Sequence, residues 1–140
     1  AFALTSSAYC SLIADGVHLD PRVLALAFAA LGPERAVLVT DAVAWRAGTV
    51  SGIGIEWRDG APRLPDGTLA GSSLTMDAAV RECVAAGIPL EHALRAATQN
   101  PAAVLGLTDR GRLESGRRAD VVALTPDLRV AATWVGGQRT

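Results

Sequence analysis

The sequence predicts an α/β fold built on a parallel sheet. Two short apolar runs, 11–14 and 36–39, have the character of strands that are buried on both faces. The segment between them, 20–32, has the periodicity and the end signals of a helix. A strand, a helix and a second strand in this order form a βαβ unit, in which the two strands run parallel. The carboxyl ends of both strands should therefore meet at one edge of the sheet.

The helix between these strands has clear boundaries. Asp20 suits the N-cap position and Pro21 the first turn, while Gly32 and Pro33 end the helix. Its apolar residues recur at helical spacing and are Leu24, Phe28 and Leu31.

Polar residues follow both strands directly. The first strand is followed by Asp15, Gly16, Val17 and His18, and the second leads into Asp41. Residues at this position line the active-site edge of parallel α/β sheets, where an aspartate can act as a general base. The alternative is structural: an aspartate that turns the backbone beside a solvated histidine, and a second aspartate that serves a turn or a helix cap.

Residues 48–66 interrupt the alternation of strands and helices. Apolar and polar residues alternate over 49–58, and Asp59-Gly60 is a strong hairpin-turn signal. We expect a β-hairpin that leaves the main sheet, with residues 63–64 pairing back.

Three helices should follow this hairpin. The glycine- and serine-rich stretch 67–76 leads into the first, which Ser72 or Ser73 could cap and Gly87 would end. Its expected buried face comprises Met76, Val80, Cys83 and Val84, and an outer i,i+4 ion pair joins Asp77 to Arg81. The next two helices are expected at about 90–98 and 101–105.

The C-terminal residues change character to strands. Two runs, 119–124 and 130–135, are joined through Pro126-Asp127 and followed by Gly136-Gly137. We expect these strands to pair with the hairpin of residues 48–66 in a small β-domain.

Composition excludes several classes of function. The 13 basic and 14 acidic residues balance, which gives no electrostatic basis for binding nucleic acid or an anionic membrane. Every basic residue is an arginine, so lysine chemistry is excluded within this stretch. No apolar run approaches the roughly 20 residues that span a bilayer. The two cysteines form no disulfide framework, which favours a reduced, cytoplasmic protein.

The sequence does not contain a convincing metal site. A hydrolytic zinc or iron site needs about three protein ligands and an open position. His18 and Asp41 with one further acid could barely supply them, and we expect His92 to face solvent beside Glu91 and Arg95. We therefore assign no metal ligand to this chain. Because it opens almost directly into a buried-type strand, we also expect it to be part of something larger.

Three segments, 14–18, 38–42 and 67–76, closely resemble in order and spacing those of the N-acetylglucosamine-6-phosphate deacetylase family, within the amidohydrolase superfamily. Two further motifs, 98–107 and 111–122, are generic to the superfamily. The resemblance extends from about Leu12 to Val135 and corresponds to the C-terminal part of the family's proteins.

The resemblance implies a (β/α)8 TIM-type barrel with a small β-domain. Residues 1–47 and 67–110 would belong to the C-terminal portion of the barrel, and residues 48–66 and 111–140 to strands of the β-domain. The implied reaction is hydrolysis of the acetamido group of N-acetylglucosamine 6-phosphate, which yields glucosamine 6-phosphate and acetate.

The resemblance also implies roles for particular residues. Asp41 matches the catalytic aspartate, which takes a proton from metal-bound water and passes it to the leaving amine. The residues that match substrate-binding segments are Asp15, Gly16, Val17, His18, Leu69, Ala70, Gly71 and Ser72. The divalent metal, zinc or iron, would have its ligands, one Glu and two His, outside this chain. The implied partners are a sugar-phosphate substrate, the missing N-terminal part of the barrel, and a second subunit of a homodimer.

Two alternatives remain. One is another enzyme of the superfamily, dihydroorotase-like or aminoacylase-like, and segment 67–76 counts against it. The other is a non-catalytic fragment that folds or docks through barrel surfaces. Because the chain lacks metal ligands, the non-catalytic alternative is favoured for the isolated chain, which we expect to be inactive.

Overall fold

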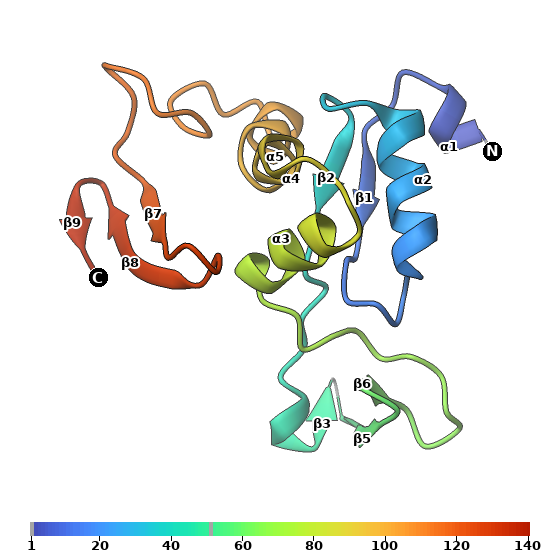
Figure 1. Ribbon diagram of the computed structural model, residues 1–140. Coiled ribbons are helices and arrows are strands. Elements are labelled where there is room, and N and C mark those ends of the chain that lie inside the picture. Colours follow the sequence, from blue (N-terminus) through green and yellow to red (C-terminus); the bar gives the residue numbers. More distant parts are fainter. Residues whose placement is uncertain (1, 51) are drawn as a thin grey trace.

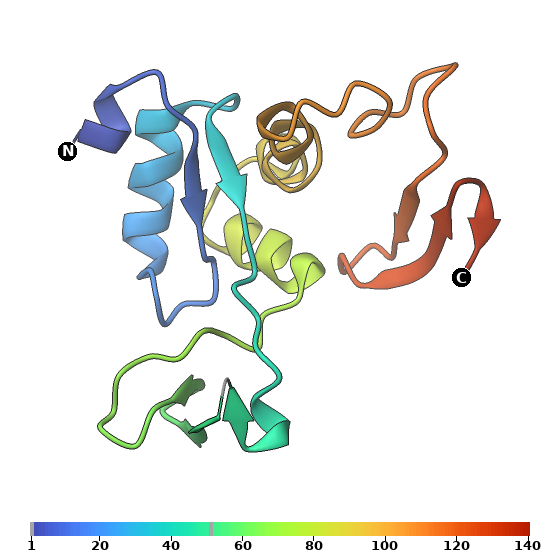
Figure 2. The ribbon, with the colours of Figure 1, turned by 180° about the vertical axis from the view of Figure 1, so that it is seen from behind.

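The computed structural model describes residues 2–50 and 52–140 (Figure 1). A parallel strand pair lies at its centre with helices packed around it, and small antiparallel β units extend from this body (Figures 1 and 2). None of the helices in the described residues is long and apolar enough to cross a membrane.

The predicted βαβ arrangement of parallel strands is confirmed. Strand β1 (Cys10–Leu12) runs parallel to β2 (Ala36–Leu38), with Leu12 opposite Leu38, and α2 (Pro21–Leu31) connects them. The strand expected at 11–14 thus begins and ends slightly earlier. The sequence predicts no helix before this strand, which is wrong, because a short helix, α1 (Phe2–Thr5), precedes β1. In Figure 2 both arrows point toward the β-hairpin region, so their carboxyl ends face it.

Helix α2 has the predicted ends and the predicted buried face. Asp20 is the N-cap, and its Oδ1 accepts a hydrogen bond from Arg22 N at 2.9 Å. The helix ends at Gly32, whose φ of 69° lies in the left-handed region where glycine is favoured. The predicted apolar residues are buried, and they are Leu24, Phe28 and Leu31.

Helices α3 (Met76–Ala85), α4 (Leu90–Ala97) and α5 (Gln99–Val104) confirm the predicted helical region. The predicted serine cap is wrong, because Thr75 occupies the N-cap of α3. The burial of Val84 is also wrong, since its side chain is 37% exposed. Val80 and Cys83 lie on the buried face of the helix. Val84 follows Cys83 and is rotated by about 100° around the helix axis, which turns its side chain away from that face.

Asn100 connects α5 to the central strands. Its side chain is buried, and its Nδ2 donates to Pro33 O at 2.9 Å and to Ala36 O at 2.7 Å. These bonds hold the start of β2 against α5 and explain why the motif at 98–102 contains an asparagine.

The excursion after β2 is divided into short pieces. A 3-10 turn, η1 (Trp45–Ala47), precedes β3 (Thr49–Val50), which pairs with β4 (Ile53–Gly54). Strand β5 (Glu56–Arg58) then pairs with β6 (Ala61–Arg63) around the predicted turn at Asp59-Gly60. Both turn residues have positive φ, 52° and 79°, as the twist of a tight hairpin favours. The turn is confirmed, but the continuous strand expected over 49–58 is wrong.

The C-terminal strands β7 (Val121–Leu124), β8 (Val130–Val135) and β9 (Gln138–Arg139) form an antiparallel sheet of their own. Within the described residues they do not pair with the hairpin, so that predicted pairing is wrong. The two β units lie on different sides of the body in Figures 1 and 2. The hairpin is instead tied to the chain that follows it, where Ala70 N donates to Pro62 O at 2.9 Å.

Candidate active site

Three segments meet at the carboxyl end of the parallel strands, and we call them the rim: 15–18 after β1, 40–43 after β2, and 69–73 after the hairpin. The last two pair directly. Ser72 N donates to Asp41 O at 2.7 Å, and Val43 N donates to Ser72 O at 3.0 Å. The structure therefore brings all the predicted site segments to one edge of the sheet. For residues 69–72 this position could not be inferred from sequence order, because they follow the hairpin and not a strand of the central sheet.

Ser72 is a buried residue of the rim, at 1% exposure. Its hydroxyl donates to the carbonyl oxygen of Thr40 and accepts from Leu74 N at 3.0 Å. The backbone N–H groups of Ala70 and Ser72 are also used within the protein. This segment thus shapes the rim and holds the backbone on both sides of Asp41.

Gly71 allows the two segments to approach closely. Its φ is 83°, and a Cβ atom added there would lie 2.6 Å from Val43 Cγ1 and 2.8 Å from Asp41 O. Both distances are shorter than normal contacts, so glycine is required at this position.

Asp41 is exposed and has a φ of 49°, a conformation that aspartate and asparagine adopt more readily than most residues. In the part of the chain that the structure describes, its carboxylate has no hydrogen-bond or ion-pair partner, whereas its backbone carbonyl is held by Ser72. The carboxylate is therefore available to a ligand or a water molecule at the carboxyl end of β2, as the sequence predicts.

Asp15 and His18 form a closed unit within their loop. Asp15 Oδ1 accepts from the backbone N–H groups of Val17 at 3.0 Å and His18 at 2.8 Å. Asp15 Oδ2 lies 2.7 Å from His18 Nδ1. Partial burial favours a higher pKa for Asp15, but the hydrogen bonds from His18 and Val17 outweigh it and lower the pKa below its ordinary value. Asp15 is therefore ionised at neutral pH.

The turn of the β5–β6 hairpin lies beside the rim, an approach that the sequence did not reveal. A Cβ atom added to Gly60 would lie 3.8 Å from Val17 Cγ2, which is an ordinary contact distance. The hairpin thus borders the loop that carries His18. The one sequence signal for it was the Asp59-Gly60 turn, which fixes the hairpin but not its neighbour.

The described residues do not form a metal site by themselves. Within the described residues, no group of three or more His, Cys, Asp or Glu side chains is placed to hold a metal ion. Both carboxylate oxygens of Asp15 and the Nδ1 of His18 are engaged with each other or with the backbone. His18 Nε2 and the Asp41 carboxylate remain, which is fewer than a hydrolytic metal centre needs.

Two residues outside the rim behave as the sequence predicts. The His92 side chain is 35% exposed and lies 3.6 Å from Glu91 Oε1. Cys83 is fully buried in the core, where burial raises the pKa of its thiol to about 12, so it is not a nucleophile.

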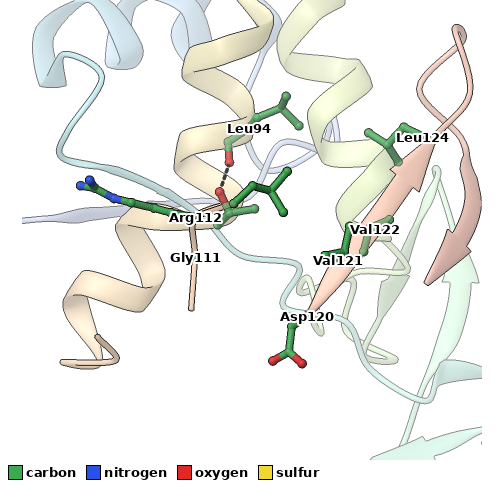
Figure 3. A pocket seen from close by; sticks show the side chains of 9 residues that line it. Leu94, Gly111, Arg112, Asp120, Val121, Val122 and Leu124 are labelled. Carbon is green, nitrogen blue, oxygen red and sulfur yellow. Dashed lines mark hydrogen bonds between the residues drawn. The ribbon is translucent and has the colours of Figure 1, made fainter. Parts of the chain in front are cut away.

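A cavity of about 410 Å³ lies away from the rim, between α4, the loop 111–113 and β7 (Figure 3). Figure 3 shows Leu94 on α4 across from Val121 and Leu124 on β7. Its walls are mainly apolar, and none of the predicted site residues lines it.

Comparison with known proteins agrees with this arrangement. The sequence matches the amidohydrolase family over residues 5–140. The chain belongs to this family. The resemblance inferred from the three rim segments is confirmed, and the family generally implies a divalent metal.

Two curated relatives carry deacetylase names. The N-acetylgalactosamine-6-phosphate deacetylase of Escherichia coli O157:H7 is 40% identical over 139 residues, covering 94% of this chain and 36% of that protein. The N-acetylglucosamine-6-phosphate deacetylase of Bos taurus is 41% identical over 144 residues, covering 93% of this chain and 34% of that protein. This chain thus spans about a third of the length of these two relatives.

A solved structure supports the fold as well. The N-acetylglucosamine-6-phosphate deacetylase of Thermotoga maritima superposes with a TM-score of 0.91 at 35% identity, covering 98% of this chain and 40% of that chain. The mixed α/β architecture that the sequence predicts is therefore shared with a deacetylase over nearly all of this chain.

Proposed function

We propose that this chain is the C-terminal part of a (β/α)8-barrel enzyme that hydrolyses the acetamido group of N-acetylglucosamine 6-phosphate. The observation that carries the proposal is the exposed Asp41 carboxylate at the end of β2, whose backbone pairs with Ser72 and lies against Gly71. Relatives named as hexosamine-phosphate deacetylases support the substrate class.

Asp41 is the proton carrier of this reaction. The oxygen of a water molecule attacks the amide carbonyl carbon, and Asp41 takes one of the water protons. The C–N bond then breaks, and Asp41 delivers that proton to the leaving nitrogen, so that the amine departs neutral. Acetic acid remains, and it becomes acetate when it releases the second water proton to solvent. Two other segments of the rim border the sugar phosphate. They are the loop 15–18, which carries His18, and the segment 69–72.

The metal that the family implies has its ligands outside these residues, because the described part of the chain offers too few. We expect zinc or iron there, as a Lewis acid for the carbonyl. The remaining part of the barrel supplies those ligands, and a second subunit completes a homodimer. We place the enzyme in the cytoplasm, with no nucleic-acid or membrane partner.

The galactosamine epimer is a second candidate substrate, because relatives named for each epimer have nearly the same identity to this chain, 40% and 41%. The two sugars differ at one hydroxyl, and the rim side chains described above do not distinguish them.

The test is acetate release by the full-length protein that contains this chain. N-acetylglucosamine 6-phosphate and its galactosamine epimer are compared with N-acetylglucosamine lacking the phosphate and with an N-acetylated amino acid. Dihydroorotate, whose hydrolysis opens the ring and releases no acetate, is followed by formation of N-carbamoyl aspartate. We expect the highest kcat/KM on one of the phosphorylated sugars. Turnover confined to dihydroorotate or the acylated amino acid would assign another amidohydrolase reaction, and no turnover at all would favour a non-catalytic protein.

A further inference from the structure

We propose that Asp15 is a positioning residue, which holds the imidazole of His18 with a proton on Nδ1 and leaves Nε2 for the substrate. This inference rests on the proposed function, in which His18 borders the sugar phosphate. In this proposal Asp15 does not contact the substrate directly. It acts by orienting His18.

The carboxylate of Asp15 is directed into its own loop. Its two oxygens receive three hydrogen bonds, from Val17 N, His18 N and the His18 ring, at 2.7 to 3.0 Å. The side chain is only 11% exposed. A group that is engaged in this way has little remaining capacity to bind a sugar hydroxyl or to coordinate a metal.

The same carboxylate fixes the proton on the ring. An ionised carboxylate only accepts hydrogen bonds, so His18 Nδ1, at 2.7 Å from Asp15 Oδ2, must donate. The lowered pKa of Asp15 keeps the carboxylate ionised at neutral pH. The proton therefore stays on Nδ1 whether or not the ring carries a second proton.

The orientation of His18 is fixed at two points. Asp15 Oδ1 holds the backbone N–H of His18 and Asp15 Oδ2 holds its ring, so main chain and side chain are set by one carboxylate. Gly16, with a φ of 73°, allows the loop to turn back for this contact.

The other ring nitrogen is left open. Within the described residues His18 Nε2 has no hydrogen-bond partner, and Arg95 Nε is the buried side-chain atom found without one. Because His18 Nε2 also has no partner but is not among these buried atoms, it is accessible to solvent at the rim. The His18 side chain as a whole is only 18% exposed. A ring held in this way presents Nε2 without the entropic cost of ordering the side chain when substrate binds.

Asp15→Asn separates the two functions of the carboxylate. The amide oxygen can still accept the two backbone N–H groups, so the loop is retained. The amide nitrogen, however, donates toward Nδ1, which forces the ring proton onto Nε2. In the full-length enzyme we expect the fold to be retained with a slightly lower melting temperature, because the ionised carboxylate stabilises its loop. We expect kcat/KM to decrease by about 10- to 100-fold, the range for groups that orient a metal-bound histidine.

Asp20→Asn is the matched control. Asp20 also lies in the connection between β1 and α2 and caps α2, but it is exposed and does not contact His18. Since asparagine caps helices as well as aspartate does, kcat/KM should stay at the wild-type value.

A double-mutant cycle distinguishes positioning from a general structural effect. His18→Ala removes the group through which Asp15 acts, so Asp15→Asn should cause no further loss of kcat/KM in that background. Losses that multiply in the double variant would overturn the proposal, as would wild-type kcat/KM in Asp15→Asn alone.

The ¹⁵N spectrum of the histidine rings gives a readout that does not depend on activity. The His18 signals are identified by their loss in His18→Ala and recorded at a pH where the ring is neutral. We expect the proton on Nδ1 in the wild type and on Nε2 in Asp15→Asn. A wild-type ring protonated on Nε2 would refute the role of Asp15, whereas absence of acetate release by the wild type would refute the proposed function alone.

Discussion

Asp41 combines an unusual backbone conformation with an unpaired carboxylate. Residues other than glycine rarely adopt positive φ, and such residues concentrate at functional sites, where the surrounding structure maintains them. Here the surrounding structure consists of Ser72 and Gly71, which lie against the backbone of Asp41. The strain is therefore compensated by pairing between two chain segments, and the carboxylate itself remains available for chemistry.

Asp41→Asn tests this assignment in the full-length enzyme. Asparagine tolerates the left-handed conformation about as well as aspartate, so thermal unfolding and metal content should be nearly unchanged. Loss of the proton carrier should decrease kcat by a factor of order 10² to 10⁴. Turnover at the wild-type rate would show that another group carries the proton.

Gly71→Ala tests the support of Asp41. An added methyl group would meet Val43 and the backbone of Asp41 at 2.6 and 2.8 Å, in addition to the strain of a φ of 83°. We expect a lower melting temperature and a lower kcat. Gly87→Ala is the matched control, because Gly87 has a similar φ of 85° but open space around its Cβ position. Equal losses in the two variants would mean that the close contact with Asp41 is unimportant.

At the scale of elements, features set by neighbouring residues could be predicted from the sequence. The ends and buried face of α2 follow from a cap, a proline, a glycine and a helical period, all within the helix itself. The turn at Asp59-Gly60 is likewise a local property. The i,i+4 pair between Asp77 and Arg81 is confirmed at 2.7 Å for the same reason.

Features that depend on distant residues could not be predicted. Ser72 or Ser73 was expected to cap α3, but the hydroxyl of Ser72 binds Thr40, a partner far earlier in the chain, and Thr75 is the N-cap. The C-terminal strands were expected to pair with the hairpin, yet each unit pairs within itself. For the candidate site, the sequence identified the segments of the rim but not the inward direction of the Asp15 carboxylate, because the orientation of a side chain in a loop has no periodic signal.

The Asp77–Arg81 pair also connects α3 to the C-terminal sheet, since Arg81 Nη1 donates to Leu128 O at 2.9 Å. A hydrogen bond with Thr75 and the contact with Arg81 lower the pKa of Asp77 to about 2, from 3.8. A carboxylate whose pKa is lowered in the folded state stabilises the protein at pH values above its ordinary pKa. This contribution to stability is lost as the pH falls toward 2.

The corresponding prediction concerns the pH dependence of stability. Asp77→Asn should have a lower melting temperature than the wild type at pH 7, and the difference should persist down to about pH 4 and decrease below it. Glu82→Gln, an exposed change on the same helix, controls for the loss of one negative charge. A difference that is constant from pH 7 to pH 3 would show that ionisation of Asp77 does not contribute.

At the scale of the whole molecule, the central sheet is incomplete. Within the described residues β1 pairs only with β2, although parallel sheets in α/β proteins are covered on both faces and extended on both sides. Within the described residues the rim contains the proposed proton carrier and the His18 loop but too few groups to hold a metal ion. Both features support the proposal that the enzyme contains protein beyond these residues.

The last prediction is that residues 1–140 alone release no acetate from N-acetylglucosamine 6-phosphate and bind no stoichiometric metal. The open edges of β1 and β2 should also make this fragment prone to association, because unpaired strand edges recruit other chains. The fragment and the full-length protein are compared by elemental analysis, acetate release and size-exclusion chromatography in the same zinc-containing buffer. Retention of metal and turnover by the fragment would mean that His18 and Asp41 suffice for a metal centre, and that the ligands proposed to lie outside this chain are unnecessary.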